Sequence, residues 1–263
     1  MKKYLEVMRT SIMYYFVIRL RFILWRVRQI IFIFVTYFLW YSIFEGKRSL
    51  FGYTQAEILT YILLATLISN FVMSTETYMV ANDINSGDII NYILKPLSFF
   101  KYNLARDSAD KLINVFFTIF EIMLIVWLFK PSLYFNGNGT NILTIIVFVL
   151  LGTLIAFFIN LSLSFIAFWT TEAWAIQFVY FILVGFLSGA YFPLDILPKP
   201  IFYFLLATPF PYLYYLPTKI YIRGTDWLLP IELVMCCLWI IFSYYIARFL
   251  WEKGLRSYNF VGR

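Results

Sequence analysis

Six long and nearly uncharged apolar segments run through this sequence and decide which fold classes are open to it. They lie at about residues 29–44, 57–80, 112–129, 142–169, 173–191 and 228–250. A helix needs about 20 largely apolar residues to cross a bilayer, and helices satisfy their own backbone hydrogen bonds in lipid. The sequence therefore predicts an all-α membrane protein with six transmembrane helices.

The composition leaves little chain for anything else. Hydrophobic residues make up 62% and charged residues 13%, against about 45–50% and about 25% in soluble domains. We expect one transmembrane domain over residues 1–263, with any soluble machinery on another chain. The sequence has no histidine, and its two cysteines, Cys236 and Cys237, are neighbours in an apolar run. It therefore predicts no catalytic group and no metal site.

Residues 1–26 are predicted to form an amphipathic interfacial helix rather than a cleavable signal peptide. At helical spacing Lys2 and Arg9 share one face, while Leu5 and Met8 share the other. A short charged tail that orients the first span is the alternative. Arginines at the start of the first apolar segment are expected to reach the interface by snorkelling. They are Arg19, Arg21, Arg26 and Arg28.

Residues 192–227, before the last span, are apolar but interrupted by prolines. Each proline removes a helical hydrogen bond that lipid cannot replace. The prolines are Pro193, Pro198, Pro200, Pro209, Pro211 and Pro217. We predict an extracytoplasmic hairpin of short interfacial or re-entrant helices over Pro198–Pro217. The alternative is a seventh span over Ile201–Leu216.

The distribution of basic residues predicts the topology. With six spans and a cytoplasmic N-terminus, fifteen of the 21 Lys and Arg residues lie on the cytoplasmic side. The positive-inside rule therefore favours six spans with both termini in the cytoplasm, and a seventh span would weaken the asymmetry. The net charge of +7 is explained by topology, and it gives no reason to expect nucleic acid as a partner.

The loop at residues 82–111, between the second and third spans, contains a short amphipathic segment. Gly87 has turn chemistry, and the apolar residues after it recur at helical spacing up to a break at Pro96. Such a helix can insert into a groove on a partner protein. An ordinary interfacial helix lying on lipid is the alternative.

Polar residues inside the apolar segments are candidates for a substrate path, because each is costly in hydrocarbon. The candidates are Glu121, Asn160, Glu76, Asn70 and Asn114. Hydrogen bonding between helices, without any contact to substrate, is the alternative for each of them.

Taken together, these features resemble the type-2 ABC transporter permeases. The N-terminal helix, the six spans, the G-D-I-x-x-Y-I-L-K-P segment and the proline-rich hairpin carry the resemblance. The ending L-W-x-x-G-L-R-x-Y is similar to a branch of small export permeases that work with a separate ATPase. The resemblance covers essentially the whole chain.

The resemblance implies a dimer of permease subunits, homomeric or heteromeric, held in membrane lipid with two ATPase subunits below it. The expected location is the bacterial cytoplasmic membrane. ATP and Mg²⁺ would bind to the ATPase, since Tyr41 occupies the first glycine position of a phosphate loop ending at Gly46-Lys47 and no cofactor is expected in this chain. The residues that couple to the ATPase would be Gly87, Asp88, Ile89, Ile90, Ile93, Leu94, Lys95, Pro96 and Leu97.

Three classes of function therefore compete at the level of the sequence. An export permease needs ATP from its partner, a channel or passive carrier does not, and a membrane-embedded enzyme needs converging catalytic groups. The scattered carboxylates disfavour the enzyme. Drugs, peptides, lipids and glycans all stay open as substrates.

Overall fold

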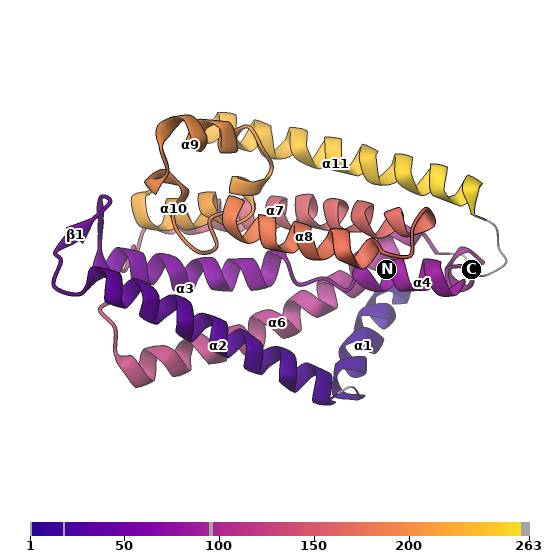
Figure 1. Ribbon diagram of the computed structural model, residues 1–263, viewed down its shortest axis with the longest axis horizontal. Helices are drawn as coiled ribbons and strands as arrows, with labels where there is room; N and C mark the ends of the chain where they lie inside the picture. Colours follow the sequence, from indigo (N-terminus) through magenta and orange to yellow (C-terminus); the bar gives the residue numbers. More distant parts are fainter. Residues whose placement is uncertain (1, 18, 95–96, 259–263) are drawn as a thin grey trace.

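A computed structural model of the protein describes residues 2–17, 19–94 and 97–258, and these residues form a mostly helical, elongated bundle (Figure 1). The long elements are α1 (Lys2–Val17), α2 (Arg19–Phe44), α3 (Gln55–Val72), α4 (Tyr78–Ser86), α6 (Phe99–Phe129), α7 (Gly139–Phe165), α8 (Ala173–Leu187) and α11 (Leu229–Ser257). The short elements are β1 (Ser49–Leu50), β2 (Tyr53–Thr54), α5 (Ile90–Ile93), η1 (Ile166–Phe168), η2 (Leu194–Ile196), α9 (Lys199–Leu206), η3 (Phe210–Tyr212) and α10 (Tyr215–Arg223). Strands β1 and β2 pair antiparallel at one end of the bundle. We call that end the hairpin end and the opposite end, which carries α4, the α4 end.

The predicted all-α membrane fold is confirmed at this level. Among the described residues, five helices are long and apolar enough to cross a membrane. They cover Phe22–Phe44, Gln55–Val72, Phe99–Phe129, Gly139–Phe168 and Leu229–Ser257. The predicted fifth span corresponds to α8, which has 15 residues and is shorter than a typical crossing. The count of six spans therefore stays a prediction.

Helix α8 ends earlier than the apolar pattern suggests because of a glycine. Residues up to 191 are apolar or small, but Gly189 adopts a φ of +80° directly after the helix cap at Ser188. A Cβ on Gly189 would also lie 2.8 Å from the Tyr61 hydroxyl oxygen.

The second predicted span, residues 57–80, extends too far: the helix ends at Val72. Helix α3 begins at a capping box between Thr54 and Glu57 and ends at Val72, and α4 begins only at Tyr78. The segment between them is polar, and its Ser and Thr side chains compete for backbone hydrogen bonds. The Thr75 hydroxyl, for example, accepts a hydrogen bond from the Thr77 amide at 3.2 Å.

The third predicted span starts too late, and the loop at residues 82–111 is mostly helical. Helix α6 begins at Phe99, so the connection between α4 and α6 is only residues 87–98, including α5. The first helix also differs from the prediction: α1 ends at Val17 and α2 begins at Arg19, well before residue 26.

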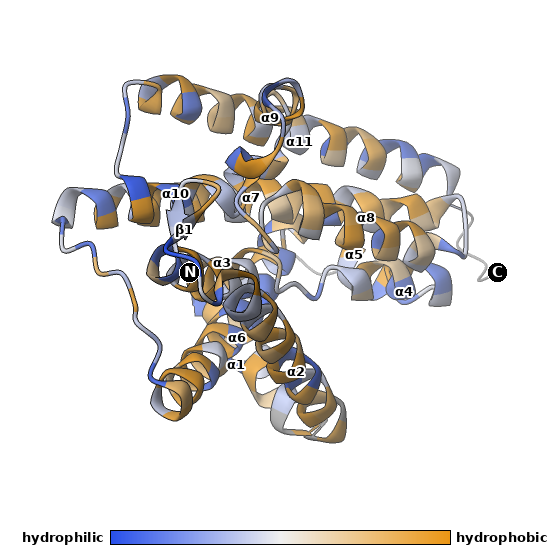
Figure 2. Cartoon of the chain, turned by 60° about the vertical axis from the view of Figure 1, so that its left-hand side comes forward, coloured by the Kyte–Doolittle hydropathy of each residue, from blue (hydrophilic) through white to orange (hydrophobic). Residues whose placement is uncertain are grey.

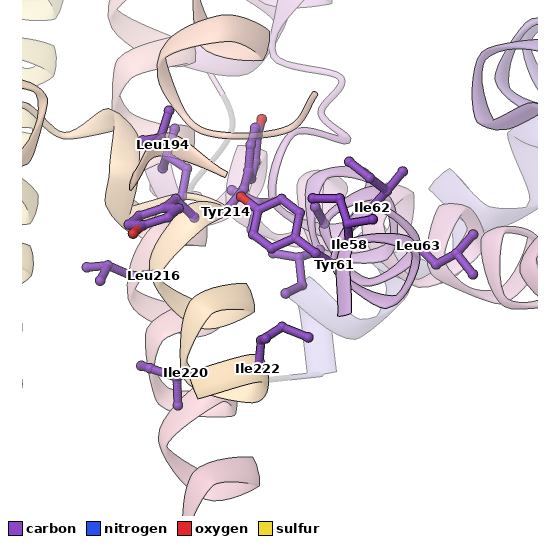
Figure 3. Close-up of a cluster of buried hydrophobic side chains, with 14 of the residues drawn as sticks. Ile58, Tyr61, Ile62, Leu63, Leu194, Tyr214, Leu216, Ile220 and Ile222 are labelled. Atoms are coloured by element: carbon purple, nitrogen blue, oxygen red, sulfur yellow. The ribbon is translucent and has the colours of Figure 1, made fainter. Parts of the chain in front are cut away.

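The proline-rich segment forms short helices, as predicted, and its inner part is buried in protein (Figure 3). The seventh-span alternative fails because α9 ends at Leu206, inside the proposed span. The side chains of Tyr214, Tyr215 and Leu216 are almost fully buried against α3 and α7. Gly152 lies near the middle of α7, and a Cβ there would come within 2.9 Å of the Tyr212 carbonyl oxygen. Helix α7 therefore runs unbroken through Gly152, and the missing side chain admits the hairpin backbone.

The outer faces of the long helices are hydrophobic (Figure 2). Large apolar side chains are exposed on α1, α2, α6, α7, α8 and α11, such as Val35 on α2, Phe120 on α6 and Ile241 on α11. Exposed apolar surface on so many helices is typical of contact with lipid or with other membrane helices.

Candidate functional site

The predicted coupling residues lie in the connection between α4 and α6, at the α4 end. Gly87 closes α4 with a φ of +88°, a conformation that suits glycine. The chain then turns back, and the Ile89 amide donates to the Asp83 carbonyl at 2.9 Å. Asp88 is exposed and accepts a hydrogen bond from the Ser86 hydroxyl at 2.7 Å.

The apolar residues of this segment divide into two groups. Ile89 is fully buried, whereas Leu94 is 78% exposed and Ile93 40% exposed. Ile90 and Leu97 are half-buried, and Lys95 and Pro96 lie outside the described residues. The sequence predicted that these residues share one apolar face, and for Ile89 this prediction is wrong. Ile89 points into the protein and anchors the segment, whereas Ile93 and Leu94 face outward.

A second hydrophobic cluster anchors the segment, and we call it the α4-end cluster. Its buried members are Val80, Ala81, Ile84, Ile89, Phe157, Leu161, Phe165, Ala167, Phe168, Ala173 and Ala247. At its edge the ring of Phe99 stacks on Trp251 with centroids 4.1 Å apart and planes 18° apart. The Tyr258 hydroxyl donates to the Ile84 carbonyl at 2.7 Å. The connection between α4 and α6 is thus tied to α7 and to the end of α11.

Close packing of α11 on Phe168, a member of the α4-end cluster, explains the glycine in the C-terminal L-W-x-x-G-L-R-x-Y pattern. Gly254 is buried with the Phe168 ring directly against it, so that a Cβ would overlap the ring. Trp251 and Tyr258 from the same pattern also contact Phe168, with ring centroids 6.0 and 5.5 Å away. The pattern therefore holds α11 on η1 and α4.

We expect Gly254→Ala to loosen this end of the bundle. Overpacking a tight contact costs about 1–3 kcal/mol, so the melting temperature of the purified protein in detergent should fall. Gly139→Ala is the matched control, because Gly139 lies in a helix and a Cβ there would meet no atom within 4 Å. Equal melting temperatures for the two variants would contradict the role assigned to Gly254.

The candidate path residue Glu121 lies in a buried ion pair. The Arg26 Nη2 atom lies 2.6 Å from Glu121 Oε1, and both side chains are more than nine-tenths buried. Arg26 also donates to Asn114 Oδ1 at 3.1 Å and to Thr118 Oγ1 at 3.2 Å. Arg26 therefore does not snorkel to the interface. It joins α2 to α6 and brings two candidate path residues, Glu121 and Asn114, together.

The cluster around Arg26 continues toward α1. The Asn114 amide donates to Asp110 Oδ1 at 3.0 Å, and the Tyr15 hydroxyl donates to the same carboxylate oxygen. Burial, and after it the nearby Asp110 carboxylate, raise the pKa of Tyr15 well above its usual range. The Tyr15 hydroxyl thus keeps its proton and fixes α1 on α6.

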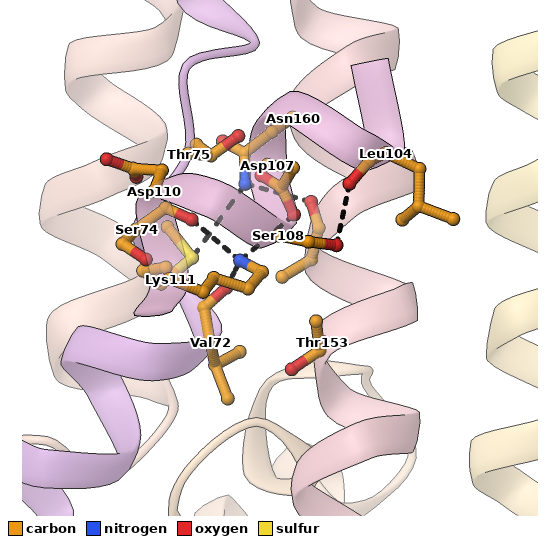
Figure 4. A network of polar contacts seen from close by, with 12 residues as sticks. Val72, Ser74, Thr75, Leu104, Asp107, Ser108, Asp110, Lys111, Thr153 and Asn160 are labelled. Atoms are coloured by element: carbon orange, nitrogen blue, oxygen red, sulfur yellow. Dashed lines mark hydrogen bonds and ion pairs between the residues drawn. The ribbon is translucent and has the colours of Figure 1, made fainter. Parts of the chain in front are cut away.

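A buried lysine satisfies the broken end of α3 (Figure 4). The Lys111 ammonium donates to the carbonyls of Val72 at 3.0 Å and Ser74 at 2.6 Å, and it lies 3.1 Å from Asp107 Oδ2. The last carbonyls of a helix have no partner within it, and here a cation supplies the donors. Lys111 thereby makes the break between α3 and α4 possible inside the protein.

The other candidate path residues lie in separate places. Glu76, in the break between α3 and α4, pairs with Arg106 at 3.3 Å. The Asn70 side-chain oxygen accepts from Gln29 at 2.6 Å, and the Asn160 amide donates to the Ala156 carbonyl at 2.8 Å. Each candidate has at least one partner within the protein in this arrangement of the helices, but the second carboxylate oxygen of Glu121, Oε2, is buried without a hydrogen bond. Their role in a substrate path stays a prediction.

Among the described residues, Arg26, Asp107, Asp110, Lys111 and Glu232 are buried charges that the sequence did not single out as candidates. Arg26 was expected at the interface, and Asp107, Asp110 and Lys111 were expected in the loop at residues 82–111. One signal was available for Arg26, because Glu121 in a span requires a cation from another span. Among the described residues, no group of three or more His, Cys, Asp or Glu side chains is arranged to hold a metal ion.

At the hairpin end a network of contacts joins the β1–β2 strand pair and the start of α3 to the proline-rich segment. The Tyr53 hydroxyl donates to Asp195 Oδ2 at 2.8 Å, and the Tyr61 hydroxyl donates to the Gly189 carbonyl at 2.7 Å. Arg223 pairs with Glu57 at 3.2 Å and lies over the Tyr53 ring. These contacts hold the proline-rich segment and the residues around Gly189 against α3 and the strand pair.

Comparison with known families identifies one match. The family described as ABC-2 family transporter protein matches residues 30–262, which is most of the chain. No curated protein matches the chain significantly.

Proposed function

The chain belongs to the ABC-2 transporter family of multi-pass membrane proteins, and from this we propose that it is a permease subunit of an ATP-driven exporter. In this role the chain forms half of the transmembrane pathway. A separate ATPase subunit binds ATP and Mg²⁺ and drives substrate efflux. A second permease subunit, identical or related, supplies the other half.

The observation that carries the proposal is the segment around Leu94. An exposed leucine and isoleucine follow a fully buried isoleucine, within a connection of only twelve residues between α4 and α6. Apolar side chains presented from an anchored short helix suit insertion into a groove on a partner protein. We assign that groove to the ATPase subunit, with Gly87 to Leu97 as the coupling segment.

The anchoring of the coupling segment indicates how movement would reach the membrane part. Ile89, Phe99 and the Tyr258 hydroxyl connect the segment to α7 and α11 through close packing and a hydrogen bond. Displacement of the segment by the ATPase would therefore move these two helices with it. The ATPase must also bind the inward- and outward-facing arrangements with different affinities, because otherwise ATP could shift nothing.

The topology of the proposal follows from the charges. The α4 end would face the cytoplasm of a bacterium, and both termini would lie on that side. The hairpin end would face outward. Glu121, Asn114, Asn160, Glu76 and Asn70 stay the candidate path residues, with the Arg26–Glu121 pair holding α2 and α6 together between transport events.

We expect Leu94→Asp to remove the ATPase without unfolding the permease. A carboxylate would replace the most exposed apolar side chain of the coupling segment and would be costly to bury in an apolar groove. The tagged chain is purified from its native membranes, and vanadate-sensitive ATP hydrolysis is measured in the eluate. That activity should fall at least about tenfold, which corresponds to about 1.4 kcal/mol of binding.

Leu143→Asp would itself be unfavourable in lipid, so the matched control uses alanine at both sites. Leu94→Ala should weaken the association, whereas Leu143→Ala removes another exposed leucine, near the start of α7, and should leave the association intact. Full ATPase recovery with Leu94→Asp would refute the coupling assignment. Transport by the purified chain without any ATPase would instead indicate a passive carrier.

A further inference from the structure

Arg28 is an exposed arginine inside a membrane-spanning helix. It belongs to the span Phe22–Phe44 of α2, and its side chain lies at the surface of the chain. Its guanidinium carbon lies 3.8 Å from the centroid of the Trp25 ring and 5.9 Å from that of the Phe181 ring on α8. A cation is costly in hydrocarbon, so an ionisable residue in a span is expected to have a function. We propose that Arg28 lines the substrate path and selects an amphipathic anion as the substrate, an inference that rests on the proposed function.

Arg28 has no counter-ion within the described part of the chain. The ion pairs there involve other basic residues, and the nearby Arg26 is paired with Glu121. A second copy of this chain would not supply a carboxylate at the same depth either. Acidic residues inside the spans, such as Glu121 and Glu232, are buried in their own subunit, and the exposed ones lie in α1, in connections between the long helices or in the last two turns of α11. In a homomeric transporter the counter-ion of Arg28 must therefore come from a molecule or ion that binds there.

The neighbours of Arg28 place it at the level of the middle of α8. Phe181 lies eight residues after Ala173, the first residue of α8, which is about 12 Å at 1.5 Å per residue. One turn further along α2, the Phe32 ring contacts the Tyr191 ring just after α8, with centroids 5.5 Å apart. From this contact toward its start, α2 slopes away from α8 (Figures 1 and 2). The guanidinium thus lies beside α8 rather than at the end of α2, where snorkelling would place it.

Aromatic and polar groups next to Arg28 indicate the class of the anion. The rings of Trp25 and Phe181 are 49% and 44% exposed, so both can pack on a further apolar group. The next residue, Gln29, donates to Asn70, which is a candidate path residue. A guanidinium binds carboxylate, phosphate or sulfonate through paired hydrogen bonds, and the apolar part of the same molecule can lie on the two rings. The substrate class that fits is therefore an anion with an apolar body.

Photo-crosslinking with three matched probes tests the proposal. The purified chain is reconstituted in vesicles of phosphatidylcholine, which has no net charge, and no ATP is added. The probes are para-benzoylbenzoate, para-benzoylbenzamide and para-(aminomethyl)benzophenone, which share one photoreactive body and are anionic, neutral and cationic. Labelled peptides are mapped by mass spectrometry. We expect the anionic probe to label residues 25–32 and 178–186 about tenfold more than the cationic probe, with the neutral probe between them. Equal labelling of these residues by the three probes would overturn the proposal.

Variants of Arg28 connect the preference to this side chain. Arg28→Gln removes the charge and should abolish the preference for the anionic probe, whereas Arg28→Lys keeps a cation and should retain part of it. The matched control is Arg248→Gln, which removes an exposed arginine from α11 and should leave the preference unchanged. An unaltered preference in a folded Arg28→Gln protein would contradict the role of Arg28. If that variant does not fold, the label map of the unaltered chain decides, because anionic label spread evenly over all exposed helix faces would also overturn the proposal.

Two further measurements identify the source of the anion and separate this inference from the proposed function. Decanoate, a soluble amphipathic anion, should displace the anionic probe several-fold more than phosphatidylglycerol added to the vesicles. Displacement by phosphatidylglycerol alone would assign Arg28 to a lipid headgroup and overturn the inference. Vanadate-sensitive ATP hydrolysis is measured separately in the eluate of the unaltered chain. Its absence would refute the exporter but leave the anion site, whereas ATP hydrolysis in a protein without any anion preference would refute the inference alone.

Discussion

Replacing Arg26 by methionine is expected to destabilise the protein more than removal of any surface charge. The substitution leaves the Glu121 carboxylate buried without its cation, and it removes the donors to Asn114 and Thr118. Breaking a buried pair from one side costs about 3–5 kcal/mol, because an uncompensated charge is left behind. The free energy of unfolding, measured by titration with SDS in mixed micelles, should fall by that amount.

A second substitution separates charge from packing. The double variant Arg26→Met/Glu121→Leu removes both charges and should recover stability to within about 1 kcal/mol of the original protein. The control is Arg248→Ala, which breaks an exposed Arg–Glu pair one helical turn apart on α11 and should have no measurable effect. If the double variant were as unstable as Arg26→Met, the loss would come from packing or from Asn114 and Thr118 rather than from the buried charge.

Replacing Lys111 by methionine is expected to have a comparable effect with a different pattern of rescue. The ammonium neutralises Asp107 and also donates to the Val72 and Ser74 carbonyls at the end of α3. Its loss should cost about 3–5 kcal/mol for the unpaired carboxylate, and about 1–3 kcal/mol more for carbonyls left without a donor. The same unfolding titration measures both contributions together.

The rescue experiment distinguishes the two roles of Lys111. In Lys111→Met/Asp107→Leu the charge problem is removed, but the two carbonyls still lack a donor, so recovery should be only partial. Lys101→Met is the control, since Lys101 lies on the same helix with its side chain exposed. Complete recovery in the double variant would show that the break between α3 and α4 does not depend on the lysine.

The comparison of Arg26 with Lys111 also shows where prediction from the sequence was limited. Arg26 and Glu121 are separated by 95 residues, and Lys111 and Val72 by 39. A hydropathy pattern identifies a charge that is costly in lipid, but the rotation of each helix about its axis decides which charges meet. The expected interface position of Arg26 and the expected loop position of Lys111 follow from the local sequence, but both side chains are buried between helices in the folded chain.

The same limit applies to helix ends. Helices α7 and α11 begin close to their predicted positions, because a sharp change from polar to apolar residues marks the start of each helix. The C-terminal ends of α3 and α8 differ from their predicted positions. Helix α3 ends early because Lys111, which is distant in the sequence, stabilises the break after Val72. Helix α8 ends early because the backbone of Gly189 adopts a positive φ.

By itself the sequence determined that this protein lies in a membrane, that it is helical, and that its proline-rich segment is broken into short helices. These properties depend on hydrophobicity and backbone hydrogen bonding, which act locally along the chain. Only the tertiary structure decided that Ile89 anchors the connection between α4 and α6 while Leu94 faces outward, and that Arg26 neutralises Glu121. It also decided that α11 is tied to η1 through Gly254 and to α4 through Tyr258. Each of these depends on which helix faces meet, and packing in three dimensions settles that.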